Sequence, residues 1–323
     1  MARTAALSAL AALTLLASAC VGLTGYSGYL DHKDYDQGLT VARRELAADP
    51  DDADSNYWAG RFLLAKDDAA AALPLLQRAA DLEPGDADKQ FWLGVACWGV
   101  QDFDRELAQY RRALELDPRH LSANLYLGHA YLDRGRLAPA LAQYDKVLEL
   151  DPYEPGALYN RAVVLAETGR RAEAVEALLR FLDAYPEGRM GAAAADLLNT
   201  QGDFTYRNAR LGRRTVTLRA VRFAPGGTDL AFGASDSLDV VGSMLANNPA
   251  LAVHVVVYVQ GDAALARDRA RRIRSFFRTF HPAVREDQLD LSWFGAAEDV
   301  EAPGGPFALK ESVLFITKVP ATN

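Results

Sequence analysis

The sequence predicts an α-solenoid of repeated helical hairpins, followed by a two-layer α/β domain. Prolines recur at one interval through the first part of the chain, at positions 50, 84, 118, 152 and 186, each 34 residues after the last (84 − 50 = 34). After residue 215 the pattern changes to alternating β-rich and amphipathic segments. The chain has 323 residues, 50% of them hydrophobic, which is enough for about two domains with packed cores.

The repeat is clearest in one stretch of the chain, LSANLYLGHAYLDRGRLAPALAQYDKVLELDP, which runs from Leu121 to Pro152. Several of its residues stand at offsets that recur in the other copies: Gly128, Tyr131, Gly135, Ala140 and Tyr144. This 34-residue pattern resembles the tetratricopeptide family. The resemblance implies that each unit is a helical hairpin that buries its apolar face by stacking on its neighbours.

Small and large residues alternate in the repeat in a way that suits two closely packed helices. We expect small residues where the helices touch: Gly60, Gly94, Gly128 and Ala162 in the first helices, and Ala79, Ala113 and Val147 in the second. Large residues should fill the space between them: Leu76, Tyr110, Tyr144 and Leu178. Proline closes each hairpin because it cannot continue a helix interior. Four repeats are predicted over residues 53–186, and residues 20–52 hold a degenerate first repeat in which only the second helix is legible.

The start of the chain has the order of a secretory signal peptide, with Arg3 before an apolar run and small residues before Cys20. The segment Ala17-Ser18-Ala19-Cys20 resembles the lipobox of bacterial lipoproteins. That resemblance implies cleavage after residue 19, lipid on Cys20 and, because Val21 follows, an outer-membrane anchor facing the periplasm. The alternative is an uncleaved transmembrane helix, for which this alanine-rich stretch is short.

One face of the first helices is the predicted binding surface. In the tetratricopeptide family the residues at repeat positions 5, 9 and 12 line a groove, and at this spacing they share one helix face. Here they are Tyr57, Arg61, Leu64, Phe91, Val95, Trp98, Leu125, His129, Leu132, Tyr159, Val163 and Ala166. The set is mostly aromatic and apolar, which favours an extended peptide or a partner helix. The alternative is that individual rings belong to the core between helices.

The last third of the chain is predicted to contain a capping helix and linker over residues 187–214 and an α/β domain over residues 215–323. The expected strands are TVTLRAVRF, which ends at residue 223, LAVHVVVYV at 251–259, LDLSWFG from 289, and SVLFIT from 312. Helices are expected near residues 238–245 and 265–280, the second of them amphipathic.

This order resembles the OmpA-like domain that binds peptidoglycan. The resemblance rests on F-x-P-G-G-x-x-L after the first strand, N-N-P before the second, and L-x-x-x-R-A in the following helix. In that family an Asp and an Arg bind the wall peptide, and the arginine corresponds to Arg269. Gln260 stands where the family has the aspartate, Asp262 is the nearest replacement, and the loop that follows is shorter. The domain is therefore a divergent member of this pattern, with peptidoglycan as a possible ligand.

Composition and the lack of known motifs argue against several classes of function. The net charge of −8 argues against nucleic acid as the main partner. No catalytic motif is legible, and the five histidines are scattered, so we expect neither an enzyme nor a metal site nor a cofactor other than the lipid. We expect a cell-envelope scaffold that binds periplasmic or membrane proteins through its repeats, with the OmpA-like module as a second docking surface. The alternative is a tether between outer membrane and peptidoglycan.

Overall fold

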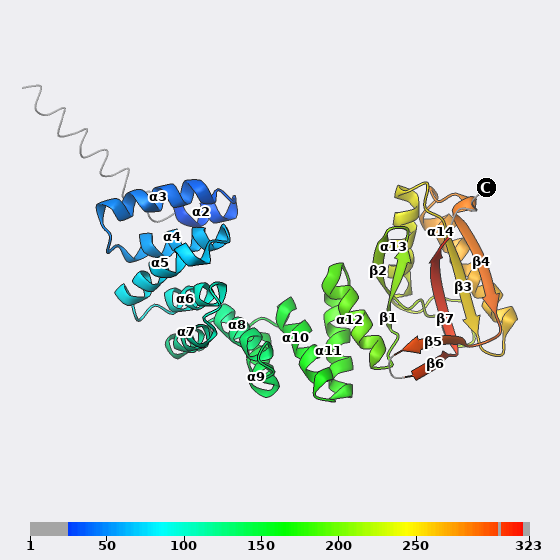
Figure 1. The fold of residues 1–323 in the computed structure, drawn as a ribbon. Helices are drawn as coiled ribbons and strands as arrows, with labels where there is room; N and C mark the ends of the chain where they lie inside the picture. The colour runs from blue at the N-terminus through cyan, green and yellow to red at the C-terminus, as the bar shows by residue number, and fades with distance from the viewer. Residues whose placement is uncertain (1–24, 303–304, 319–323) are drawn as a thin grey trace, which may run out of the picture. The chain divides into compact units, whose positions relative to one another are not determined.

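The computed structural model describes residues 25–302 and 305–318, and these fall into two compact units divided after Leu150 (Figure 1). All the regular elements described in the first unit are helices. Its helices are α2 (Gly25–Asp31), α3 (Tyr35–Ala48), α4 (Ala53–Ala65), α5 (Ala69–Leu82), α6 (Ala87–Gly99), α7 (Phe103–Leu116), α8 (Leu121–Leu132) and α9 (Leu137–Leu150). The pairs α4–α5, α6–α7 and α8–α9 are the first three predicted hairpins, so this part of the chain is a solenoid of repeats, as predicted.

Acidic residues begin most of these helices. The side chain of Asp52 accepts a hydrogen bond from the Ser55 amide (2.6 Å), and Asp68 does the same at α5. Asp86 and Asp102 cap α6 and α7 in the same way. An N-cap carboxylate satisfies an amide that has no partner inside the helix and stabilises the helix dipole. The Asp-rich loops of the sequence are therefore helix-start signals.

The turn inside each hairpin uses one residue with positive φ, and these residues share the 34-residue spacing. Glycine occupies the position in two repeats, Gly135 with φ 65° and Gly169 with φ 71°. Asp67 and Gln101 occupy it in two others, with φ 60° and 63°. The left-handed conformation costs little for glycine but disfavours residues with a Cβ.

Glycine in the first helix of a hairpin allows a large side chain of the second helix to lie directly against its backbone. A Cβ on Gly94 would lie 2.6 Å from Tyr110 Cε1, and a Cβ on Gly128 would lie 2.8 Å from Tyr144 Cε1. Leu76 fills the same place against Gly60. The large side chains are at most 1% exposed: Leu76, Tyr110, Tyr144 and Leu178. The hairpins therefore contain the predicted pairing of small with large residues.

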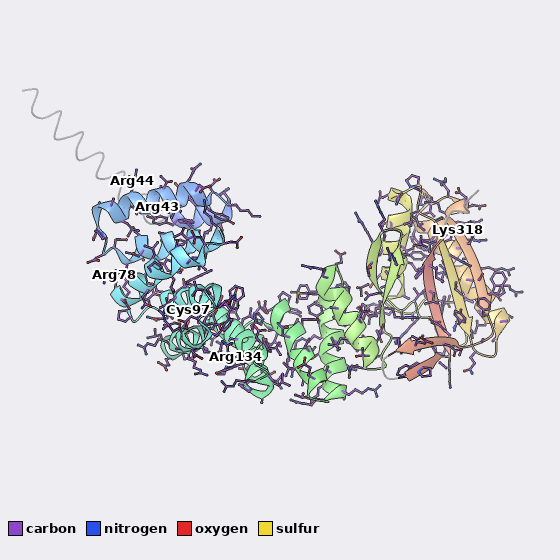
Figure 2. All side chains as sticks on the ribbon, in the orientation of Figure 1. Arg43, Arg44, Arg78, Cys97, Arg134 and Lys318 are labelled. Carbon is purple, nitrogen blue, oxygen red and sulfur yellow. The ribbon has the colours of Figure 1, made fainter. Side chains whose placement is uncertain are left out.

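Charged side chains join neighbouring repeats. Lys89, which is 5% exposed, lies near Asp54 of the preceding repeat at 3.0 Å and near Glu83 at 2.7 Å. Farther along, Arg134, which Figure 2 labels, donates to the buried Glu106 carboxylate at 2.8 Å. Burial lowers the pKa of the Lys89 ammonium, but hydrogen bonds to the carboxylates outweigh it and raise the pKa. Lys89 therefore stays charged and holds two repeats together.

The second unit contains the fourth hairpin and the α/β part. Its elements are α10 (Pro155–Glu167), α11 (Arg171–Ala184), α12 (Gly188–Thr200), β1 (Tyr206–Leu211), β2 (Arg214–Arg219), α13 (Ala234–Asn247), β3 (Val253–Val259), α14 (Ala263–Phe280), a short 3-10 helix (Glu286–Gln288), β4 (Leu289–Phe294), β5 (Glu298–Ala302), β6 (Gly305–Leu309) and β7 (Glu311–Thr317).

The fourth hairpin belongs to the same compact unit as the strands, because α12 packs on α11 on one side and on β1 and β2 on the other. Tyr206 donates to Asp183 at 2.7 Å, and Asn208 donates to Asp196 at 2.7 Å. Strand β1 lies in residues predicted to be linker. Its sequence, YRNARL, is too polar to be read as a strand, yet it pairs antiparallel with β2 along its whole length.

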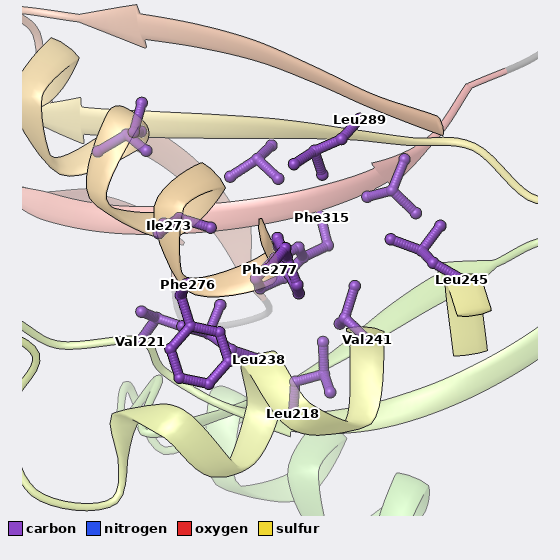
Figure 3. Packing of buried hydrophobic residues seen from close by; sticks show 14 of the residues in the cluster. Leu218, Val221, Leu238, Val241, Leu245, Ile273, Phe276, Phe277, Leu289 and Phe315 are labelled. Atoms are coloured by element: carbon purple, nitrogen blue, oxygen red, sulfur yellow. The ribbon is translucent and has the colours of Figure 1, made fainter. Parts of the chain in front are cut away.

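The main sheet has the strand order β4-β3-β7, with β3 parallel to β4 and antiparallel to β7. Helices α13 and α14 pack their apolar faces against it, and Figure 3 shows Leu238, Val241 and Phe277 in this core. The predicted alternation of strands and helices is therefore present. The β5–β6 hairpin was not predicted. Arg207 of β1 holds it through a bidentate ion pair with the buried Glu298, both distances being 2.8 Å.

We predict that Gly94→Ala lowers the free energy of unfolding by about 1–3 kcal/mol, because the added methyl group must displace the Tyr110 ring. Urea unfolding measures the change. Gly85→Ala is the matched control, since a Cβ there meets nothing within 4 Å. Equal stability of the two variants would contradict the close approach of the paired helices.

Candidate protein-binding site

The predicted groove residues of the first unit differ in how much of each side chain is exposed. Trp98 is 55% exposed, whereas Tyr57 and Phe91 are buried at 6% and 3%. The others are half-buried: Arg61, Leu64, Val95, Leu125, His129 and Leu132. The face therefore combines rings that belong to the core with side chains that a partner can reach.

Arg61 is the most constrained of the reachable residues. Its guanidinium lies 4.8 Å from the ring centre of Trp58 on the same helix and 4.3 Å from that of Trp92 on α6. Its Nη1 donates to the Tyr57 hydroxyl at 3.1 Å. Within the described residues, its Nε has no hydrogen-bond partner. Two indole rings thus hold a cation in place by cation–π attraction and leave it with hydrogen-bonding capacity.

A hydrogen-bonded chain fixes the ring beside Arg61. The Tyr57 hydroxyl donates to Asp88, and His120 Nε2 lies 3.3 Å from the other oxygen of that carboxylate. Burial raises the pKa of the Asp88 carboxyl, but the hydrogen bonds from His120 and Tyr57 outweigh burial and hold the pKa below its usual value. Burial also raises the pKa of the Tyr57 hydroxyl, which keeps its proton and remains a donor. These three residues lie near the starts of α4, α6 and α8, so the hydrogen bonds join the first helices of three successive repeats.

The Phe91 ring belongs to the core between helices. Its ring centre lies 5.7 Å from that of Tyr110, 5.1 Å from that of His120 and 5.3 Å from that of Tyr126, which it meets edge-on. Tyr126 is 40% exposed and covers Phe91 from the outside. The ring that a partner meets here is therefore Tyr126, which the sequence did not single out, together with Trp98.

The groove residues predicted in the fourth repeat lie in the second unit. Tyr159 is half-buried against Phe181, with ring centres 5.6 Å apart, and burial raises the pKa of its hydroxyl. Val163 and Ala166 are half-buried on the same helix. The Tyr159 ring therefore packs within its own hairpin.

The three predicted peptidoglycan-binding residues have separate roles. Arg269 is 1% exposed, and its guanidinium donates to Gly227 O and to the Glu311 carboxylate, each at 2.9 Å. Asp262 is exposed and caps α14 by accepting from the Leu265 amide at 2.8 Å. Gln260 is exposed at the end of β3. No hydrogen bond or ion pair among the described residues joins the three.

The predicted lipidation residue, Cys20, lies outside the described residues. Among the helices that the structure describes, none has the length and apolar character needed to cross a membrane. The same residues hold no cluster of three or more histidine, cysteine or carboxylate side chains that could bind a metal ion.

Sequence reasoning missed Trp58 and Trp92, the two rings that hold Arg61. Both follow an aromatic residue in the pairs Tyr57-Trp58 and Phe91-Trp92, and the pairs are one repeat apart (92 − 58 = 34). The repeated doublet is the signal that could have identified them. It was overlooked because the second member of each pair is outside the groove positions of the family pattern.

Comparison with protein families identifies the repeats. Models described as tetratricopeptide repeat match residues 27–87, 63–120 and 156–188, and a model described as TPR repeat matches residues 128–169. The first match begins inside the segment predicted as a degenerate repeat. The helical hairpins of this chain are therefore tetratricopeptide repeats. A search of curated protein sequences found no match.

A comparison with solved structures found similar chains. PilF of Pseudomonas aeruginosa is 18% identical, with a TM-score of 0.51 over 56% of this chain and 81% of that one. YrrB, described as a TPR protein with an unusual peptide-binding site, is 24% identical, with a TM-score of 0.45 over 52% and 87%. MamA is 20% identical, with a TM-score of 0.46 over 50% and 95%. At these identities the similarity to PilF establishes a shared helical fold alone.

Proposed function

We propose that this protein is a non-enzymatic scaffold of the bacterial cell envelope. Its tetratricopeptide repeats bind a protein partner, and a lipid on Cys20 holds it at the outer membrane, facing the periplasm. The repeat scaffold fits protein–protein interaction. The observation that carries the proposal is the Arg61 site, where a cation held between Trp58 and Trp92 lies on the same set of helices as the exposed Trp98.

The chemistry of this surface indicates an extended peptide segment with apolar side chains and a hydrogen-bond acceptor. Trp98 and Tyr126 offer large rings, which supply most of the binding energy in such interfaces. Arg61, at a groove position of the preceding repeat, adds a guanidinium held between Trp58 and Trp92. The rings on either side restrict the guanidinium before binding, which reduces the conformational entropy lost on association.

The carboxyl-terminal α/β part serves as a second docking surface in this proposal. The sequence resemblance to OmpA-like domains and the alternation β2, α13, β3, α14, β4 support its descent from that fold. Binding of peptidoglycan is less well supported. Arg269 already has two partners, and Asp262 is engaged in capping α14. The scaffold is therefore preferred over the wall tether.

We predict that Trp98→Ala weakens binding of the full chain to its best ligands in an array of extended peptides by at least tenfold. Truncation of an exposed ring at the centre of an interface typically costs about 2 kcal/mol or more. Tyr153→Ala is the matched control, because Tyr153 is 64% exposed but lies in the second unit. Circular dichroism should show unchanged helix content in both variants. Equal loss in the two variants, or none in Trp98→Ala, would refute binding at this face.

The proposed lipid anchor on Cys20 can be tested separately from partner binding. We predict that Cys20→Ser, expressed in a bacterium with an outer membrane, moves the protein from the membrane fraction to the soluble periplasmic fraction. The reason is that two or three acyl chains anchor a protein stably, whereas the serine variant cannot be acylated. Immunoblotting of fractionated cells measures the distribution. Membrane association that persists without Cys20 would show that another segment holds the protein.

A further inference from the structure

The main sheet has one edge that no other strand of the described chain covers. In the order β4-β3-β7, strand β4 is outermost, and among the described residues it pairs with β3 alone (Figure 1). The edge at β7 is different, because the Thr317 hydroxyl donates to Arg210 O of β1 at 2.6 Å. The sequence of β4, LDLSWF, has no proline or lysine, the residues that often protect an exposed edge from pairing. The outer edge of β4 is therefore a place where another strand can add.

Two hydrogen bonds just beyond the ends of β3 show which way its backbone groups point. The Gln260 amide donates to Lys310 O at 2.7 Å, and the Lys318 amide donates to Ala252 O at 2.8 Å. Both bonds continue the register of β3 with β7. Bonded and non-bonded pairs alternate along an antiparallel ladder. The even-numbered residues of β3 therefore bond to β7, and its odd-numbered residues point their backbone groups at β4.

The same alternation identifies the free backbone groups of β4. Val255 of β3 lies opposite Leu291 in a parallel ladder, in which a residue bonds to the two neighbours of the residue opposite it. Val255 therefore bonds to Asp290 and Ser292. The N–H and C=O groups of Leu291 and Trp293 point the other way, along the outer edge of the sheet.

A row of arginines on α14 follows this edge. Its members share one helix face, at i, i+4, i+7 and i+11: Arg267, Arg271, Arg274 and Arg278. At the start of β4, Arg274 Nη2 lies 3.5 Å from Leu289 O. At the other end of β4, a Cβ on Gly295 would lie 3.0 Å from the amide nitrogen of Ala263, the first residue of α14. The arginine row therefore runs alongside the strand from one end to the other.

The arginine row is only partly neutralised. Arg267 and Arg271 share one carboxylate, that of Asp268, at 3.1 and 3.4 Å. Arg278 pairs with Glu286. In the described part of the chain, the four guanidiniums of the row therefore pair with two carboxylates. The side chains of Arg271 and Arg278 are 64% and 63% exposed, so the surplus positive charge is open to an acidic segment.

The two faces of β4 determine which side chains an added strand should carry. Leu291 packs into the core beneath α14. Residues of an added strand opposite Leu291 and Trp293 point their side chains to this same face, where the arginine row lies. The residues between them lie beside Ser292 and Phe294 on the other face, and Phe294 is 46% exposed. Acidic side chains suit the first positions, and apolar side chains suit the second.

We propose that the outer edge of β4 binds an extended peptide segment in which acidic and apolar residues alternate. The segment adds to the three-stranded sheet as a further strand. Its backbone bonds to Leu291 and Trp293, and its carboxylates meet the arginine row. A second copy of this chain is disfavoured, because two β4 strands paired about a two-fold axis bring two arginine rows together. The inference gives the second docking surface of the proposed function a position and a ligand class, and it rests on that part of the proposal.

Isothermal titration calorimetry of the full chain with synthetic peptides, blocked at both ends, tests the proposal. The peptide EVEVEVE should bind about tenfold more tightly than KVKVKVK, and added salt should weaken its binding. Methylation of alternate backbone nitrogens removes the donors along one edge of the peptide. Methylation at glutamates or at valines should abolish binding, and methylation of the other set should leave it within about twofold, because only one edge of the peptide faces β4.

Variants of β4 and α14 locate the site. Trp293→Pro removes a donor of the free edge, and Trp293→Ala keeps it. The proline variant should bind EVEVEVE about fivefold more weakly than the alanine variant. Arg271→Glu should weaken binding about fivefold, whereas Arg213→Glu, at an exposed position between β1 and β2, is the matched control and should have no effect. None of these variants touches the repeats, so their result is separate from that of Trp98→Ala.

Equal binding of EVEVEVE and KVKVKVK, no binding of EVEVEVE, or equal binding of the two methylated peptides would each overturn the proposal. Unchanged binding in folded Trp293→Pro and Arg271→Glu proteins would do the same. Analytical ultracentrifugation tests the other occupant. A dimer of the peptide-free chain that Trp293→Pro dissociates would show that a second copy covers the edge, and would also overturn the proposal.

Discussion

The close contact between a glycine on one helix and a large side chain on the next is the constraint on which the repeats depend. Tyr110 lies against the backbone of Gly94, and Tyr144 against that of Gly128, so the two helices of each hairpin approach more closely than side chains on both would allow. This contact fixes how each first helix is placed relative to its neighbour. The second helix packs in turn on the first helix of the next repeat, and in this stack Arg61 of one repeat meets Trp92 of the next.

The repeats could be predicted from the sequence because their signals are local and recur. Each hairpin repeats a small residue, a large residue and a proline at fixed offsets, and each copy supports the others. The β1 strand and the β5–β6 hairpin have no such support. β1 is polar, and its Arg207 pairs with Glu298 of the hairpin, which is far away in the sequence. Neither segment recurs along the chain, and the ion pair between them joins residues far apart in the sequence, so no local signal marks them.

The sequence predicts which face of the first helices forms the candidate site, but not how the side chains of that face pack. The first-helix face and Arg61 follow from repeat offsets alone. Whether a ring on that face is core or surface depends on the neighbouring repeat: Phe91 is covered by Tyr126, whereas Trp98 stays 55% exposed. Arg269 was identified by resemblance, and its buried ion pair with Glu311 emerges only from the structure.

The account rests on the claim that stacked repeats together hold Arg61 ready for a partner, and a double-mutant cycle between Arg61 and Trp92 tests it most directly. Urea unfolding of the parent chain, Arg61→Met, Trp92→Leu and the double variant gives the coupling free energy between the two side chains. The account predicts a coupling of about 0.5–2 kcal/mol in favour of the native pair. Strictly additive effects would contradict it.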